Sequence, residues 1–104
     1  MDRFLVDISP AALNDIRKAF HYIHERSPQN AQSWLRRLYE RIDTLETMPE
    51  RCGLIRECYA FEEEVRELLH FSHRVIFTVD KDRSLVQVLT VRHAARDELL
   101  GDEV

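Results

Sequence analysis

Residues 65–97 constrain the fold most, because apolar and polar side chains alternate along them with the period of two that suits β-strands. Three apolar runs occupy residues 65–71, 74–80 and 85–93. The second run carries apolar side chains on both faces, which is typical of a strand with a neighbour on each side. The polar loop at residues 80–84 contains no proline and is typical of a hairpin. The segment therefore predicts three consecutive antiparallel strands.

Two serine–proline pairs mark the starts of two predicted helices, at Ser9-Pro10 and Ser27-Pro28. Serine is a good N-cap and proline a good first helical residue. Each pair is followed by apolar residues at helical spacing; these are Leu13, Ile16, Phe20 and Ile23 in the first helix, and Ala31, Leu35, Leu38, Ile42 and Leu45 in the second. The second helix should end at Met48-Pro49. The short link between the helices predicts an antiparallel helical hairpin.

Residues 4–8 add a short predicted strand at or next to a sheet edge. The element order is then β-α-α-β-β-β, with a further strand near Leu54 as an option. We expect an α+β fold in which the helical hairpin packs on one face of an antiparallel sheet and leaves the other face partly open. Residues 1–104 should form a single domain.

The charge pattern argues against broad coating of nucleic acid. The chain has a net charge of −4, whereas residues 65–97 hold six Arg or Lys against four Asp or Glu. This suggests local contact with an anion. Two cysteines without matching Cys or His ligands predict no zinc site, and no glycine-rich phosphate loop is present. We predict no cofactor and no metal. The absence of a long apolar run or secretory signal predicts a cytoplasmic protein without membrane contact.

Four residues are candidates for chemistry: Arg66, Arg74, Arg92 and His93. Arginine offers a planar fork that pairs with phosphate or carboxylate. Strand alternation allows Arg66 and Arg92 to share the open sheet face. His93 stands at a strand end beside arginines and could relay a proton. The alternative is that the arginines pair with acids, such as Glu67, Asp7, Asp97 or those of a partner, and that His93 only caps or packs. His70 and His73 flank a turn but lack a third metal ligand.

Three runs of sequence carry a family resemblance: VREL at residues 65–68, HRVIFTVD at 73–80 and VLTVRHAAR at 88–96. Together with Pro49-Glu50-Arg51 and the element order, they resemble the RelE/ParE toxin superfamily of type II toxin–antitoxin and plasmid-stabilisation modules. The resemblance covers nearly the whole chain and implies a RelE/ParE-like fold.

That resemblance implies one of two activities. RelE-like members are ribosome-dependent, metal-independent endoribonucleases that cut mRNA, whereas ParE-like members inhibit DNA gyrase. Both are neutralised by an antitoxin protein. By position, Arg66 matches the family's sheet arginine, Arg74 the arginine that opens the next strand, and Arg92 and His93 the end of the last strand. In the RelE-like case Arg66 and Arg92 would stabilise phosphate charge, with His93 as acid or base. This chain departs from ribosome-dependent members, because Glu62-Glu63-Glu64 stands where they tend to carry lysines and no tyrosine follows His93.

We therefore predict a ParE-like toxin that inhibits growth through DNA gyrase. The alternatives are a RelE-like mRNA endoribonuclease acting at the ribosome and an inactive toxin-fold protein that only binds a partner. All three predict a cognate antitoxin. Its docking surfaces would be the open sheet face, the sheet edges and the outer side of the helical hairpin, through strand addition or helix-in-groove contact.

Overall fold

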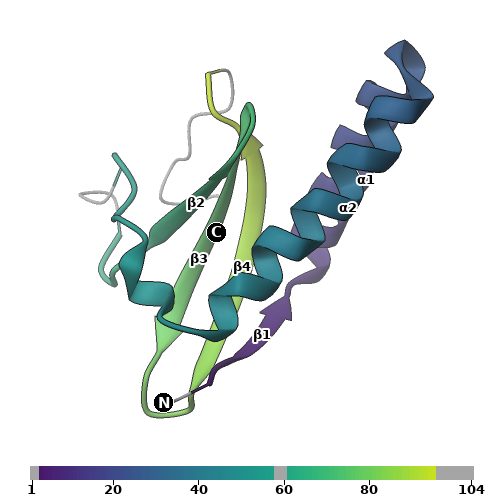
Figure 1. Ribbon diagram of the computed structural model, residues 1–104. Helices are drawn as coiled ribbons and strands as arrows, with labels where there is room; N and C mark the ends of the chain where they lie inside the picture. Colours follow the sequence, from purple (N-terminus) through teal and green to yellow (C-terminus); the bar gives the residue numbers. More distant parts are fainter. Residues whose placement is uncertain (1–2, 58–60, 96–104) are drawn as a thin grey trace.

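A computed structural model describes residues 3–57 and 61–95 of the chain. The elements follow the predicted order (Figure 1). They are β1 (Leu5–Ile8), α1 (Pro10–Arg26), α2 (Pro28–Asp43), the 3-10 turns η1 (Thr44–Glu46) and η2 (Pro49–Arg51), β2 (Arg66–His70), β3 (His73–Asp80) and β4 (Leu85–His93).

The two serine–proline pairs cap the helices as predicted. The Ser9 hydroxyl accepts a hydrogen bond from the Ala12 N–H at 3.0 Å, and the Ser27 hydroxyl accepts one from Asn30 at 3.3 Å. Ser27 also ends α1, because its N–H donates to the Ile23 carbonyl at 2.8 Å. One residue therefore closes the first helix and opens the second. This shared cap forms the tight connection of the helical hairpin, α1 and α2.

The second helix ends earlier than predicted, at Asp43. The chain continues through η1, where Leu45 remains fully buried, so the apolar stripe outlasts the α-helix. Met48 adopts a left-handed conformation (φ 47°) immediately before Pro49. Proline disfavours the right-handed α region for the residue before it, so a regular helix does not continue through this point.

The sheet has the order β1-β4-β3-β2. β2, β3 and β4 pair antiparallel as predicted, and β1 lies at an edge. However, β1 pairs parallel with β4, so the sheet is mixed and the prediction of an antiparallel sheet was wrong for this strand. Parallel pairing needs a long crossover connection. Here the helical hairpin, β2 and β3 supply it before β4 is reached.

The main core lies between the helical hairpin and one face of the sheet (Figure 1). Its most buried members include Leu38 and Ile42 of α2, Val75 and Phe77 of β3, and Val86 and Val88 of β4. A smaller cluster of Ile55, Val65 and Ile76, with Phe61 beside it, covers part of the opposite face. The predicted extra strand near Leu54 is a single bridge to Arg66. No described helix is long and apolar enough to cross a membrane.

A bulge in β4 changes which side chains share a face. Ile76 pairs with Thr90 and Phe77 pairs with Val88, so Leu89 has no partner on β3. The extra residue reverses the alternation beyond it. Arg92 thus pairs with Arg74 on the face away from the helical hairpin, whereas Arg66 pairs with the core residue Phe77. Strand alternation had allowed Arg66 and Arg92 to share one face, but the bulge places them on opposite faces.

Candidate functional site

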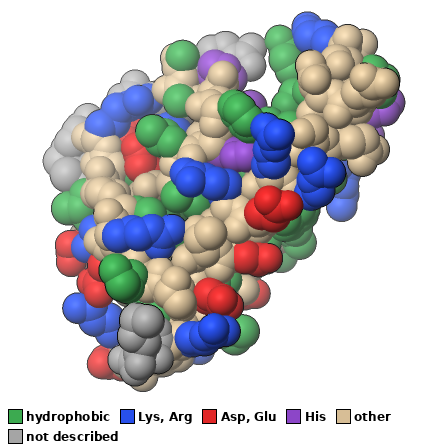
Figure 2. All heavy atoms as spheres, in the orientation of Figure 1, with side chains coloured by type: hydrophobic (Ala, Val, Ile, Leu, Met, Phe, Trp, Pro, Cys, Tyr) green, Lys and Arg blue, Asp and Glu red, His purple; other side chains and the backbone are tan. Residues whose placement is uncertain are grey.

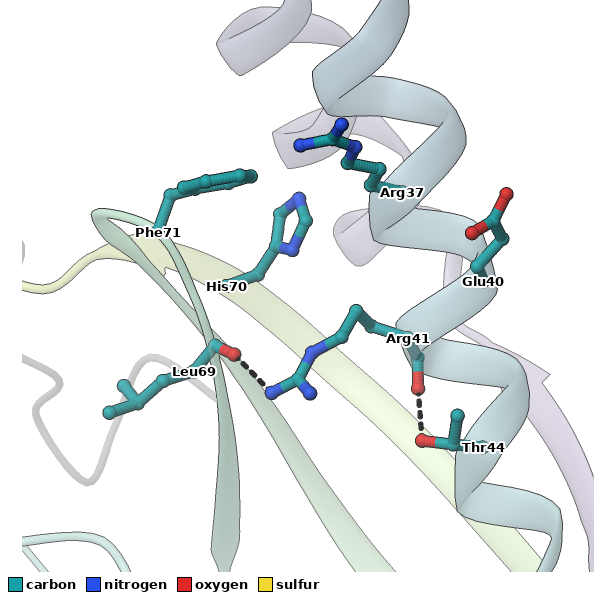
Figure 3. Close-up of a pocket in the computed structure, with 7 residues that line it drawn as sticks. All are labelled: Arg37, Glu40, Arg41, Thr44, Leu69, His70 and Phe71. Atoms are coloured by element: carbon teal, nitrogen blue, oxygen red, sulfur yellow. Dashed lines mark hydrogen bonds between the residues drawn. The ribbon is translucent and has the colours of Figure 1, made fainter.

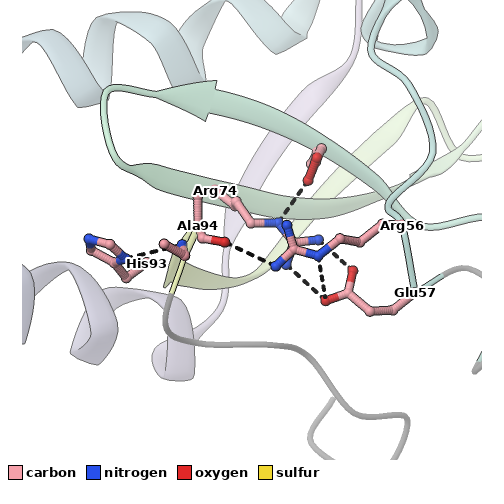
Figure 4. Close-up of polar contacts among 7 residues, drawn as sticks. Arg56, Glu57, Arg74, His93 and Ala94 are labelled. Atoms are coloured by element: carbon pink, nitrogen blue, oxygen red, sulfur yellow. Dashed lines mark hydrogen bonds and ion pairs between the residues drawn. The ribbon is translucent and has the colours of Figure 1, made fainter.

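Arg74 is the centre of a buried ion-pair cluster. Its Nη1 and Nη2 donate to the two carboxylate oxygens of Glu57 at 2.9 and 2.6 Å (Figure 4). Its Nε donates to Glu67 at 2.7 Å. The Arg74 side chain is 1% exposed. Its hydrogen bonds to Glu57 raise the pKa of the guanidinium, with a smaller contribution from Glu67. All three donor nitrogens are thus engaged inside the chain, in agreement with the alternative that Arg74 pairs with acids.

Arg56 extends this cluster to the end of the sheet. Its Nη2 donates to the Ala94 carbonyl at 2.9 Å, and its Nε lies 3.8 Å from the Glu57 carboxylate (Figure 4). Glu57 therefore contacts two arginines, one buried and one exposed. We call Arg56, Glu57, Glu67 and Arg74 the ion-pair cluster. It fastens the segment before β2 to the sheet.

Arg66 lies apart from the other three candidates. Its Nη1 donates to the Cys52 carbonyl at 2.7 Å, and its Nη2 lies 3.4 Å from the Glu64 carboxylate. The side chain is 16% exposed. Arg66 therefore connects the segment around Cys52 to the start of β2.

Arg92 and His93 line a pocket at the end of β4, which we call the β4-end pocket. It measures about 300 Å³ and is lined by Asp15, Lys18, Ala19, Tyr22, His73, Val91, Arg92 and His93. The Arg92 Nε donates to the Thr90 hydroxyl at 3.1 Å. His93 accepts from the Ala95 N–H at 3.2 Å, and its ring lies 5.4 Å from that of His73. Two of the four candidates, Arg92 and His93, thus line one pocket.

Asp15 belongs to the wall of the β4-end pocket and connects α1 to β4 through one carboxylate oxygen. Its carboxylate accepts hydrogen bonds from the Thr90 hydroxyl and from the Val91 N–H, the latter at 3.1 Å. These bonds cover the part of the β4 edge that lies beyond β1.

A second and larger hollow lies between α2 and the edge strand β2 and was missed by the sequence analysis (Figure 3). We call it the β2-edge groove. It measures about 560 Å³ and is lined by Arg37, Glu40, Arg41, Thr44, Leu69, His70 and Phe71. The Arg41 Nη2 donates to the Leu69 carbonyl at 2.7 Å. Within residues 3–57 and 61–95, the Arg37 side chain forms no hydrogen bond or ion pair.

The basic wall of the groove could have been found in the sequence. Trp34, Arg37 and Arg41 stand at positions i, i+3 and i+7, which is one face of a helix. The analysis of α2 followed only its apolar stripe. Figure 2 shows Lys, Arg and His side chains beside apolar ones around the hollow between the helical hairpin and the sheet.

His70 forms the floor of the groove and is kept neutral. It is 4% exposed, and its Nε2–H donates to the Trp34 carbonyl at 3.1 Å. Burial lowers the pKa of His70, against the opposing effect of this hydrogen bond, and the nearby charges of Arg41 and Arg37 lower it further. A neutral His70 adds no charge, so the positive charge of the groove comes from Arg37 and Arg41.

Phe71 stands at the rim of the groove in an unfavourable conformation. It is the first residue of the two-residue loop between the paired His70 and His73, and its φ is 53°. Glycine is the usual residue at such a position, because a bulky side chain is strained there. Phe71 is nevertheless 67% exposed, with its ring 4.7 Å from that of His70. Strained residues of this kind concentrate at functional sites.

The described residues contain no group of three His, Cys, Asp or Glu side chains that could hold a metal ion. The histidines around the two hollows contact aromatic rings. His70 and His73 lie 5.7 and 5.3 Å from the Trp34 ring.

Three solved structures share this fold. The first is from the chromosomal ParDE toxin–antitoxin system of P. aeruginosa, with a TM-score of 0.70, 18% identity, and coverage of 88% of this chain and 96% of that chain. The second is the toxin–antitoxin complex RelBE2 of Mycobacterium tuberculosis, with a TM-score of 0.57, 20% identity, and coverage of 89% of this chain and 93% of that chain. The third is the archaeal RelE–RelB complex of Pyrococcus horikoshii OT3, with a TM-score of 0.61, 20% identity, and coverage of 91% of this chain and 99% of that chain.

A search among curated proteins gave no match by sequence. The family described as "ParE toxin of type II toxin-antitoxin system, parDE" matches residues 6–98, which include every described strand and helix except the first residue of β1. This chain belongs to the ParE toxin family of type II toxin–antitoxin systems.

Proposed function

We propose that this protein inhibits growth by binding a protein target, with DNA gyrase as the target that the ParE family implies. The observation that carries the proposal is the engagement of Arg74 by Glu57 and Glu67. An arginine that is buried and bonded to two carboxylates cannot approach a phosphate unless the ion-pair cluster opens. The family match favours the same side of the superfamily.

The arrangement of the other candidates supports this proposal. mRNA cleavage needs several preorganised groups around one phosphate, and losing one donor of this kind costs about 10²–10³ in rate. Arg66 is held by a backbone carbonyl and Glu64, on the face opposite Arg92. Of the four residues predicted for phosphate chemistry, Arg92 and His93 line one pocket, whereas Arg66 and Arg74 are bonded elsewhere.

We further propose that a cognate antitoxin binds this chain and neutralises it. The family is defined within type II toxin–antitoxin systems, and the similar solved structures come from ParDE and RelBE systems. The exposed apolar side chains Leu69 and Phe71 supply surface that a partner could bury.

The test measures both activities with one preparation of purified protein. Gyrase supercoiling of relaxed plasmid should be inhibited, and a translated mRNA should stay intact in a reconstituted translation reaction. The antitoxin should restore supercoiling. If supercoiling is untouched while translated mRNA is cut, the gyrase proposal is wrong. Expression without growth arrest would instead support the inactive, partner-binding alternative.

One observation favours the RelE-like ribonuclease as a second candidate. The β4-end pocket places Arg92, His93, His73 and Lys18 around one hollow of about 300 Å³. Under this candidate His93→Gln abolishes mRNA cutting while the fold persists. Under the gyrase proposal, neither the unmodified protein nor the His93→Gln variant cuts mRNA.

A further inference from the structure

We infer that the β2-edge groove binds an extended, acidic segment of a partner protein, which pairs with the backbone at Leu69 and places a carboxylate between Arg37 and Arg41. The inference rests on the proposed function only for the source of that segment, the antitoxin. Three properties of the groove carry it: its backbone, its charge and its apolar rim.

The backbone of β2 is covered along its outer edge only as far as Glu67. The Ile55 N–H donates to the Val65 carbonyl at 2.9 Å, and the Glu67 N–H donates to the Gly53 carbonyl at 3.1 Å. Alternate residues of an edge strand direct their N–H and C=O groups outward. Leu69 is therefore the next outward position, where an incoming strand would continue the line of the 53–55 segment.

The outward groups at Leu69 are only half satisfied. Its carbonyl accepts the hydrogen bond from Arg41, while no group among residues 3–57 and 61–95 accepts from its N–H. A partner strand can supply both a carbonyl for this N–H and an N–H for this carbonyl. The second bond would replace Arg41 and release its guanidinium into the groove.

The charge of the groove selects an acidic occupant. Arg37 and Arg41 are exposed on a chain whose net charge is −4, and neither forms an ion pair within the described ranges. Glu40 also lines the groove, but it lies 3.9 Å from Arg36 on the outer side of α2. The groove thus presents two cations about one helical turn apart, a spacing that a single carboxylate can bridge.

The rim supplies the apolar half of the recognition. Leu69 is 54% exposed and Phe71 is 67% exposed, on the two sides of the buried His70. An extended segment directs alternate side chains to opposite sides. A segment that alternates acidic and apolar residues would therefore meet the arginines with one set of side chains and the rim with the other.

The experiment compares partner affinity across matched arginine variants of the full chain. The probes are the protein encoded by the adjacent reading frame, tested as the antitoxin, and a short peptide of alternating glutamate and valine. We expect Arg37→Ala and Arg41→Ala each to weaken binding roughly tenfold, and the double variant more, because truncating one member of an interfacial charge pair is costly. Arg36→Ala is the matched control, since Arg36 lies on the same helix but outside the groove. Its affinity should equal that of the unmodified chain.

Two further readouts complete the test. Leu69 should gain amide protection on binding, and affinity should fall with added salt except in the double variant. If the double variant binds both probes with full affinity, the inference is wrong even where the antitoxin still neutralises the toxin. If single-stranded RNA displaces the peptide and binds more tightly, the groove is a phosphate site and the inference is also wrong. An absent antitoxin or an absent growth arrest counts against the proposed function alone, since the peptide probe still tests the groove.

Discussion

The arginine at the centre of the ion-pair cluster and the two arginines of the β2-edge groove are used in opposite ways. Arg74 is 1% exposed and bonded to two carboxylates. Arg37 and Arg41 are exposed, and within the described ranges their only hydrogen bond is from Arg41 to a backbone carbonyl. A buried charge must be paired by the chain itself, because leaving it unpaired costs several kcal/mol. An exposed arginine has no such need and remains available to another protein.

The largest expected difference between the two regions is the effect of removing Arg74 on stability. Arg74→Ala leaves Glu57 buried at 2% exposure without its main partner, and we expect the free energy of unfolding to fall by about 3–5 kcal/mol. Urea denaturation at neutral pH measures the loss. Arg37→Ala should change it by no more than about 0.5 kcal/mol, as an exposed substitution does.

The double variant Arg74→Met/Glu57→Met checks the cause of that loss. It removes both charges together, so it should be more stable than Arg74→Ala. Equal losses in Arg74→Ala and Arg37→Ala would show that the two regions do not differ.

Acid should lower the stability of the fold through His70, at the floor of the groove. Burial holds the pKa of His70 below its ordinary value of 6.5, so the unfolded chain binds the proton first as the pH falls. The stability due to neutral His70 is therefore complete above about pH 6.5 and is lost on acidification below it. His70→Gln keeps a donor for the Trp34 carbonyl but does not titrate. The fall in unfolding free energy between pH 7.5 and 5.5 should be smaller in this variant, and identical profiles would contradict the assignment.

Phe71 offers the smallest effect and the sharpest distinction between stability and binding. Phe71→Gly removes a side chain from a left-handed position, so the free energy of unfolding should stay the same or rise by up to about 1 kcal/mol. Antitoxin affinity should nevertheless fall. Phe71→Ala keeps the strained position but also lacks the ring, so it should bind as weakly without the gain in stability. A marked loss of stability in Phe71→Gly would make Phe71 a structural residue.

The sequence predicted most of the fold because its signals are local. The serine–proline pairs define the helix starts, and alternation defines the strands. The direction of β1 was not predictable in this way, since it depends on a partner 80 residues away. The bulge at Leu89 is similarly invisible to alternation, and it alone separates Arg66 from Arg92.

The candidate site was predicted less well, for a related reason. Arginine–carboxylate pairing across different segments has no period, so the bond from Arg74 to Glu57 could not be found by pattern. Glu67, which lies on the neighbouring strand, was foreseen as an acidic partner. The groove was missed because it forms only where the polar side of α2 lies against the end of β2 and the strained loop after it. Neither segment indicates a groove by its own sequence.

The pairing of β1 with β4 has a consequence for synthesis on the ribosome. Among the described strands, β1 pairs with β4, and Asp15 of α1 likewise bonds to Thr90 and Val91 of β4. Contacts this distant in sequence form late, because closing a long loop costs entropy before it gains any bonding. A nascent chain that has not reached residue 85 therefore cannot close its sheet. The complete fold therefore forms only after β4 has left the ribosome, although both helices and β1 are made well before it.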